Sequence, residues 1–116
     1  MSIEDLQTIC LQLPGTTEDL KWDVHLCFSV HRKIYLLTTP DDFPPTATFV
    51  VPVEEVELLE NSPGFSHNKQ LGRYGWINMD DITLLTHAQW EHYIRQSYQL
   101  VVAKLPLKVR KQLGAV

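Results

Sequence analysis

The sequence has few cysteines, few glycines and no long hydrophobic run. Its only two cysteines, Cys10 and Cys27, are not spaced as a Cys-x-x-Cys pair, so we expect two reduced thiols and no disulfide. No stretch of about 18 apolar residues is present, which argues against a membrane-spanning helix. The first residues, Met1 to Asp5, are acidic and lack the basic and apolar regions of a signal peptide. We therefore expect a cytoplasmic protein without a membrane partner.

A general excess of positive charge is also missing. The chain has 116 residues, is 44% hydrophobic and carries a formal net charge of −4. A chain of this size and composition is predicted to form one domain, residues 1–116, around one core. Residues 1–60 carry a net charge of −8 and residues 61–116 a net charge of +4. A polyanion should meet the second half, although an acidic chain is overall a poor match for nucleic acid.

Hydrophobic residues recur at helical spacing near both ends of the chain. The first predicted helix starts after Ser2, its N-cap, and is stopped by Pro14-Gly15. The last one follows Thr86, which should form a capping box with Gln89, and is broken by Pro106. A short basic segment, 107–113, then closes the chain.

The middle of the chain reads mainly as strands. A short helix opens after Pro52, with Val56 and Leu59 toward the core. Extended structure is predicted at 24–30, 34–39, 46–51, 76–79 and 82–85. The first of these should be half-buried, because inward-facing Val24, Leu26, Phe28 and Val30 alternate strictly with His25, Cys27, Ser29 and His31. This order indicates an α+β domain, in which helices pack against an antiparallel sheet.

The segment 63–76 has the richest chemistry, since it mixes glycines, aromatic rings, an imidazole, an amide and two cations. Loops that carry function often have such a mixture. Lys69 and Arg73 could neutralise phosphates, Asn68 could bond a base edge or the backbone, and Tyr74 or Trp76 could stack on bases. The alternative is that the aromatic rings pack on the sheet and the cations are solvated.

Enzyme chemistry finds little support in the sequence. His25, Cys27 and His31 should share the polar side of one strand, but a zinc site would need a fourth ligand or water. Ser66 lacks the second glycine of a nucleophile elbow. No phosphate-binding glycine motif occurs either. We expect no catalytic residues, no metal and no cofactor.

Several short motifs together resemble the MmcQ/YjbR family of small bacterial proteins over essentially the whole chain. They are Leu13-Pro14-Gly15-Thr16-Thr17-Glu18 with Trp22, Phe28-Ser29-Val30 with Lys33-Ile34-Tyr35, His67-Asn68-Lys69 with Gly72-Arg73-Tyr74-Gly75-Trp76, and Ser97-Tyr98 with Leu105-Pro106. The resemblance implies a curved antiparallel β-sheet flanked by N-terminal and C-terminal helices. It also implies DNA binding of a double-wing type, with no catalytic residue to transfer. The turn at His31-Arg32 departs from the family, where a small or glycine-containing turn is more usual.

These observations lead to a functional hypothesis. We expect a non-enzymatic protein that binds double-stranded DNA. The candidate contacts are His67, Asn68, Lys69, Arg73, Lys104, Lys108, Arg110 and Lys111. The alternative is a protein-interaction or small-ligand-binding module that does not bind nucleic acid, which the net charge of −4 favours.

Overall fold

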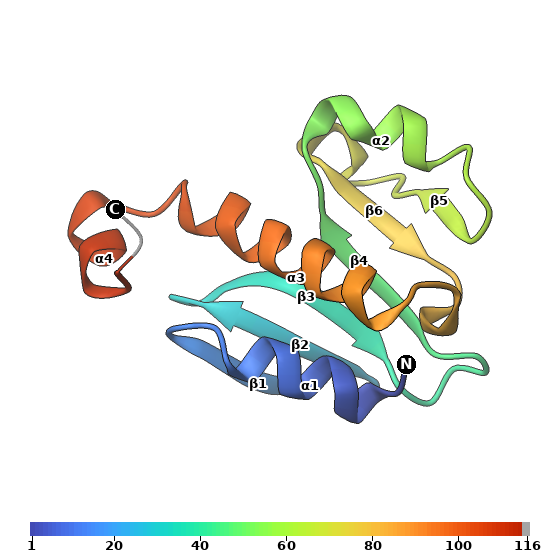
Figure 1. The fold of residues 1–116 in the computed structure, drawn as a ribbon, viewed down its shortest axis with the longest axis horizontal. Helices are drawn as coiled ribbons and strands as arrows, with labels where there is room; N and C mark the ends of the chain where they lie inside the picture. The colour runs from blue at the N-terminus through green and yellow to red at the C-terminus, as the bar shows by residue number, and fades with distance from the viewer. Residues whose placement is uncertain (115–116) are drawn as a thin grey trace.

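The computed structural model describes residues 1–114, and its elements are arranged around one six-stranded antiparallel sheet (Figure 1). The strand order across the sheet is β1-β2-β3-β4-β6-β5. The elements, in chain order, are α1 (Ile3–Leu11), β1 (Thr16–Lys21), β2 (His25–Val30), β3 (Lys33–Thr39), β4 (Thr46–Val50), α2 (Val53–Leu59), β5 (Phe65–His67), η1 (Gly72–Tyr74), β6 (Trp76–Met79), η2 (Ile82–Leu84), α3 (His87–Val102) and α4 (Leu107–Gln112). The predicted α+β class, with a sheet flanked by helices from both ends of the chain, is confirmed.

Helices α1 and α3 lie across the same face of the sheet, and the core lies between them and the strands (Figure 1). Both helices begin with the capping boxes that their sequences allow, Ser2 with Asp5 and Thr86 with Gln89. Trp90 of α3 is fully buried, and its indole nitrogen donates to the carbonyl oxygen of Ile82 at 2.7 Å. The predicted apolar face of the last helix is thereby confirmed.

Two of the strands, β1 and β5, were not predicted from the sequence. Strand β1 pairs with β2 along its whole length, from Thr16 opposite Val30 to Lys21 opposite His25. Because β1 is an edge strand whose four central residues are exposed, it has no hydrophobic alternation to recognise. Strand β5 has only three residues and pairs with β6. Strands this short give too little periodicity for a sequence prediction.

The prediction of extended structure at 82–85 was wrong for most of its length. Residues Ile82–Leu84 form a 3₁₀ helix, η2, which Asp81 caps. The carboxylate of Asp81 accepts hydrogen bonds from the Thr83 hydroxyl, at 2.6 Å, and from the Thr83 backbone N–H, at 2.9 Å. These two bonds lower the pKa of Asp81, the hydroxyl having the larger effect.

Strand β2 is not half-buried, as the strict alternation of its sequence had predicted. Residues 26–30 are all buried, so both faces of the strand are covered. Val24, which was predicted to face inward, is exposed and lies before the strand. The pairing of β2 with β3 also slips between Phe28 and Ser29, because Tyr35 is an extra residue on β3. Tyr35 enters the core, where its hydroxyl bonds Thr16 and Cys10.

The turns at the two ends of β2 have an unusual backbone. Trp22 and Asp23 precede the strand with φ angles of 53° and 59°, and His31 and Arg32 follow it with φ angles of 48° and 65°. Val30 pairs with Lys33, so the second turn has two central residues, both with positive φ. That is what a type I′ hairpin turn requires, and glycine or asparagine usually supplies it. Asp23 and His31 are of residue types that are enriched at positive φ, whereas Trp22 and Arg32 are not.

Among the described residues, no helix is both long and apolar enough to cross a membrane.

Candidate nucleic-acid interface

The loop between β5 and β6 is held by its own polar side chains. The side-chain oxygen of Asn68 accepts hydrogen bonds from the backbone N–H groups of Gln70, at 3.1 Å, and Leu71, at 2.8 Å. Its amide nitrogen donates to the side-chain oxygen of Asn78 in β6 at 3.2 Å. The amide predicted to contact nucleic acid therefore fixes the course of the loop.

Two glycines make close approaches in this loop, and at Gly75 the backbone requires one. Gly75 has a φ of +96°, and a Cβ there would lie 2.3 Å from the carbonyl oxygen of Val51. The Gly75 carbonyl in turn accepts from the Val51 backbone N–H at 2.8 Å. A Cβ on Gly72 would lie 2.5 Å from the ring of His67. The glycines thus let the loop close against β4 and against its own histidine.

The cations of this loop share a hollow with carboxylates of α2 and its C-cap. Lys69 and Arg73 line it together with Glu57 and Glu60. The His67 ring bonds Glu60, with 2.9 Å between Nδ1 and Oε2. The Arg73 guanidinium also lies over the ring of Tyr74, 4.9 Å from its centroid. Nearby negative charge therefore offsets the positive charge of Lys69 and Arg73, which weakens this loop as a phosphate site.

The aromatic residues of the segment 63–76 divide into three environments. Phe65 packs against the core, near Tyr93, as the structural interpretation of the loop had predicted. Tyr74 is 51% exposed, and Trp76 is half-buried at the start of β6. Neither Tyr74 nor Trp76 belongs to the core cluster of the described residues.

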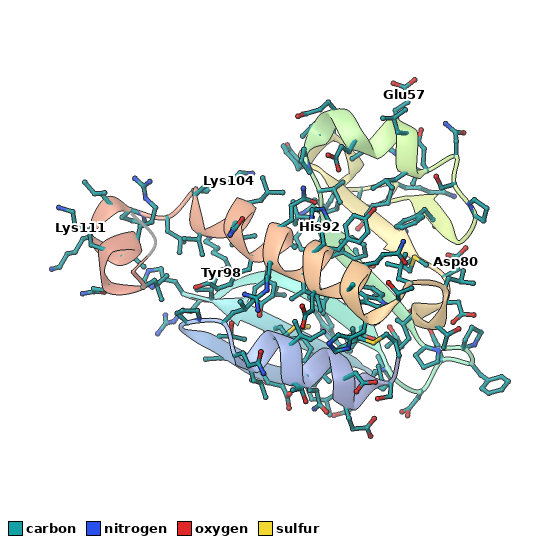
Figure 2. All side chains as sticks on the ribbon, viewed as in Figure 1. Glu57, Asp80, His92, Tyr98, Lys104 and Lys111 are labelled. Carbon is teal, nitrogen blue, oxygen red and sulfur yellow. The ribbon has the colours of Figure 1, made fainter. Side chains whose placement is uncertain are left out.

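The predicted tail cations lie at the other end of the molecule, in the turn after α3 and on α4. Lys104 and Lys111 project there, whereas Glu57 and Asp80 project at the opposite end (Figure 2). The β2–β3 turn joins them: Arg32 and Lys33 line one hollow with Lys104, and Arg32 lines a second with residues of α4. We call this surface the basic end, comprising Arg32, Lys33, Lys104, Lys108, Arg110 and Lys111.

The chain segments around the cations of the basic end contain no acidic residue. Its cations come from residues 32–33 and 104–111, and no Asp or Glu occurs from 28 to 40 or from 92 to 114. Within residues 1–114, none of its six cations forms an ion pair. The sequence prediction did not include Arg32 and Lys33 among the candidate contacts, although these two adjacent cations lie at and directly after a hairpin turn.

Thiols and histidines do not assemble into reactive groups among the described residues. Burial raises the pKa of the Cys10 thiol to about 12 and also raises the pKa of the Cys27 thiol. Both are therefore protonated near neutral pH and poor nucleophiles. His31 lies in the turn after β2, away from the strand positions of His25 and Cys27. Within residues 1–114, no three His, Cys, Asp or Glu side chains gather as metal ligands.

Two solved structures have a fold similar to that of this chain. The chain is similar to the crystal structure of a Deinococcus radiodurans protein with a DUF419 domain, at 24% identity and a TM-score of 0.86, covering 99% of this chain and 89% of that chain. A Pseudomonas syringae protein, solved as a structural genomics target, is similar at 19% identity and a TM-score of 0.71, covering 86% and 98%. No curated protein matches the sequence. The YjbR family model matches residues 11–100, and the chain therefore belongs to the YjbR family.

Proposed function

We propose that this protein binds double-stranded DNA through the basic end and does so without catalysis. The observation that carries the proposal is that Arg32 and Lys33 of the β2–β3 hairpin lie beside Lys104 and beside helix α4, which carries three more cations, with no carboxylate in either segment. Folding gains nothing from bringing like charges together, since they repel one another. A polyanion that neutralises them, releasing its own counterions, provides the missing stabilisation.

The geometry of the basic end suits a phosphate backbone. Arg32 and Lys33 project from a hairpin tip, and Lys108 and Lys111 project from a helix beside it. A duplex carries its charges along two strands, so cations on two protruding elements can contact both. The carboxylates of α2, at the other end of the molecule, would orient the approach by repulsion.

The loop cations are the weaker candidates for the same role. Lys69 and Arg73 line the same hollow as Glu57 and Glu60. A phosphate placed there would be repelled by these two carboxylates. We therefore move the proposed contact surface from the loop to the basic end, while keeping Lys104, Lys108, Arg110 and Lys111.

Two further features support a non-enzymatic protein of the cytoplasm. The raised pKa values of Cys10 and Cys27 leave both thiols unreactive. Both cysteines are free and buried, a state that a reducing compartment preserves. We include both attributes in the proposal.

The test is a titration of labelled duplex DNA at several salt concentrations. The variant Lys104→Ala/Lys108→Ala/Lys111→Ala removes three exposed cations of the basic end. The control Lys69→Ala/Arg73→Ala/Arg95→Ala removes three exposed cations elsewhere, so that both variants have the same net charge. We expect the wild-type dissociation constant to be on the order of 10⁻⁶ M at low salt.

The salt dependence separates the two variants. Loss of three phosphate contacts should lower the slope of log K against log salt by about 2.7 in the basic-end variant. The control should change the slope much less. Equal effects of the two variants would show that only net charge matters, and absence of binding at low salt would contradict the proposal outright.

A further inference from the structure

The face of the sheet opposite α1 and α3 carries a row of aligned side chains. Cross-strand pairing places them directly opposite one another, and such residues point to the same face. The row consists of Asp19, Cys27, Leu37, Thr48, Asn78 and Ser66. Its centre is mixed in character, because an apolar leucine lies beside a threonine and an asparagine.

A hollow of about 330 Å³ opens over the centre of this row. We call it the tryptophan hollow, because Trp22 from the β1–β2 turn and Trp76 from β6 both line it. Ile34 and Leu37 form its apolar part. Thr48 and Asn68 supply polar groups, and both donate hydrogen bonds to the side-chain oxygen of Asn78, at 3.1 Å and 3.2 Å. These bonds fix the orientation of the polar side of the hollow.

Trp22 is not placed where folding alone would put it. Its side chain is 74% exposed and its φ is 53°. Positive φ is rare for a bulky residue, and a strained conformation of this kind often marks a functional site. The ring of His25 contacts the indole edge-on, with 5.8 Å between ring centroids. The turn therefore holds a large aromatic surface in water beside an apolar hollow.

A second, cationic hollow adjoins the first. It is lined by Arg32, Lys33 and Lys104, and it shares Ile34 and Trp76 with the tryptophan hollow. Its volume is about 550 Å³. Among residues 1–114, no Asp or Glu lines either hollow. An aromatic surface and a cationic surface thus meet at the two side chains that they share.

We propose that the two adjoining hollows bind an unpaired nucleotide of single-stranded DNA. The base stacks against a tryptophan of the first hollow, and its phosphate lies among Arg32, Lys33 and Lys104 of the second. Stacking platforms beside cationic grooves are how proteins hold single strands. Both hollows are open to solvent, which allows the strand to continue on either side. The inference deepens the proposed DNA binding and rests on it where the two share these cations.

The test compares a labelled single strand with a labelled duplex of the same length by fluorescence anisotropy. Trp22→Gly removes the exposed indole, and glycine accepts the positive φ at this position, so the fold should not suffer. Phe43→Ala is the matched control, because Phe43 is fully exposed and does not line either hollow. We expect Trp22→Gly to weaken single-strand binding by about tenfold, the effect of losing one stacked base. Duplex binding and the control should be unchanged.

The outcomes separate this inference from the proposed function. Duplex binding through the basic end, with single-strand binding unaffected by Trp22→Gly, would overturn the inference and leave the proposed function intact. Single-strand binding that depends on Trp22, without duplex binding, would support the inference and contradict the proposed function. Competition by thymidine monophosphate supplies the third arm. If the free nucleotide binds as tightly as the strand, the site takes small molecules and the inference is wrong.

Discussion

At the scale of single residues, Ser97 connects more of the structure than any other polar side chain of α3. It is fully buried, and its hydroxyl donates to the carbonyl of Tyr35 in β3 at 2.5 Å. The same oxygen accepts from the backbone N–H of Val50 in β4 at 2.9 Å. A small polar residue therefore pairs buried backbone groups of two strands and lets the helix approach the sheet closely.

Replacing Ser97 should be costly. Ser97→Ala leaves a buried N–H and a buried carbonyl unpaired, so we expect the free energy of unfolding to fall by about 2 kcal/mol. Urea denaturation measures the change. Ser29→Ala is the control, because Ser29 is also buried but its hydroxyl makes no hydrogen bond within residues 1–114. If both variants lose the same free energy of unfolding, the hydrogen bonds of Ser97 contribute no stability beyond the packing of its side chain.

Sequence reasoning succeeds at residues whose environment is local and fails at those with distant partners. Trp90 and the cap at Thr86 follow from spacing within one helix, and both are confirmed. The loop cations looked free in the sequence. Their opposing carboxylates, Glu57 and Glu60, belong to a different element and reach them only through the fold.

At the scale of elements, the β2–β3 hairpin combines strain with charge. Its turn residues, His31 and Arg32, both adopt positive φ without being glycine or asparagine. The left-handed region costs an ordinary residue roughly 1–2 kcal/mol. The proposed function explains why the turn tolerates this cost, because Arg32 supplies a cation to the basic end.

The hairpin gives a prediction in which stability and binding move in opposite directions. Arg32→Gly should raise the free energy of unfolding by about 1 kcal/mol, since glycine relieves the strain at some cost in chain entropy. It should also weaken duplex binding, because a cation is lost. Arg32→Ala should weaken binding equally without raising stability. Thermal unfolding and the duplex titration measure both quantities, and a Gly variant that is more stable yet binds unchanged would remove Arg32 from the interface.

Elements were predictable where hydrophobic alternation was present. The strands at 34–39, 46–51 and 76–79 and the short helix after Pro52 all appear near their predicted positions. Strand β1 was missed because its exposed edge needs no apolar residues, and 82–85 was misread because a side-chain cap from Asp81 decides its conformation. Edge position and local capping are tertiary and side-chain effects that periodicity does not report.

At the scale of the whole molecule, charge is separated along the fold. The acidic side chains of α2 and the cations of α4 lie at opposite ends (Figure 2). The sequence indicated this asymmetry between its halves. It did not indicate that Arg32 and Lys33, from the acidic half, join the basic end.

Helix α4 should be dispensable for folding but not for binding. None of its residues is fully buried, and only Val109 and the following Leu113 pack partly against the core. Removing the chain from Pro106 onward should lower the free energy of unfolding by about 2 kcal/mol, the burial of two partly covered aliphatic side chains. Circular dichroism should show a folded protein. The duplex titration should show that this protein binds weakly. An unfolded product would mean that α4 is part of the core.

The two distant segments of the basic end have a thermodynamic consequence. Arg32 and Lys33 lie beside Lys104 and helix α4 only when the chain is folded, so an unfolded chain presents no comparable site. A ligand that binds only the folded state stabilises it, by about 2.7 kcal/mol when its concentration is a hundred times the dissociation constant. Occupied protein should therefore unfold, and be degraded, more slowly than free protein. The lifetime of the molecule would then depend on how often its charged end is in use.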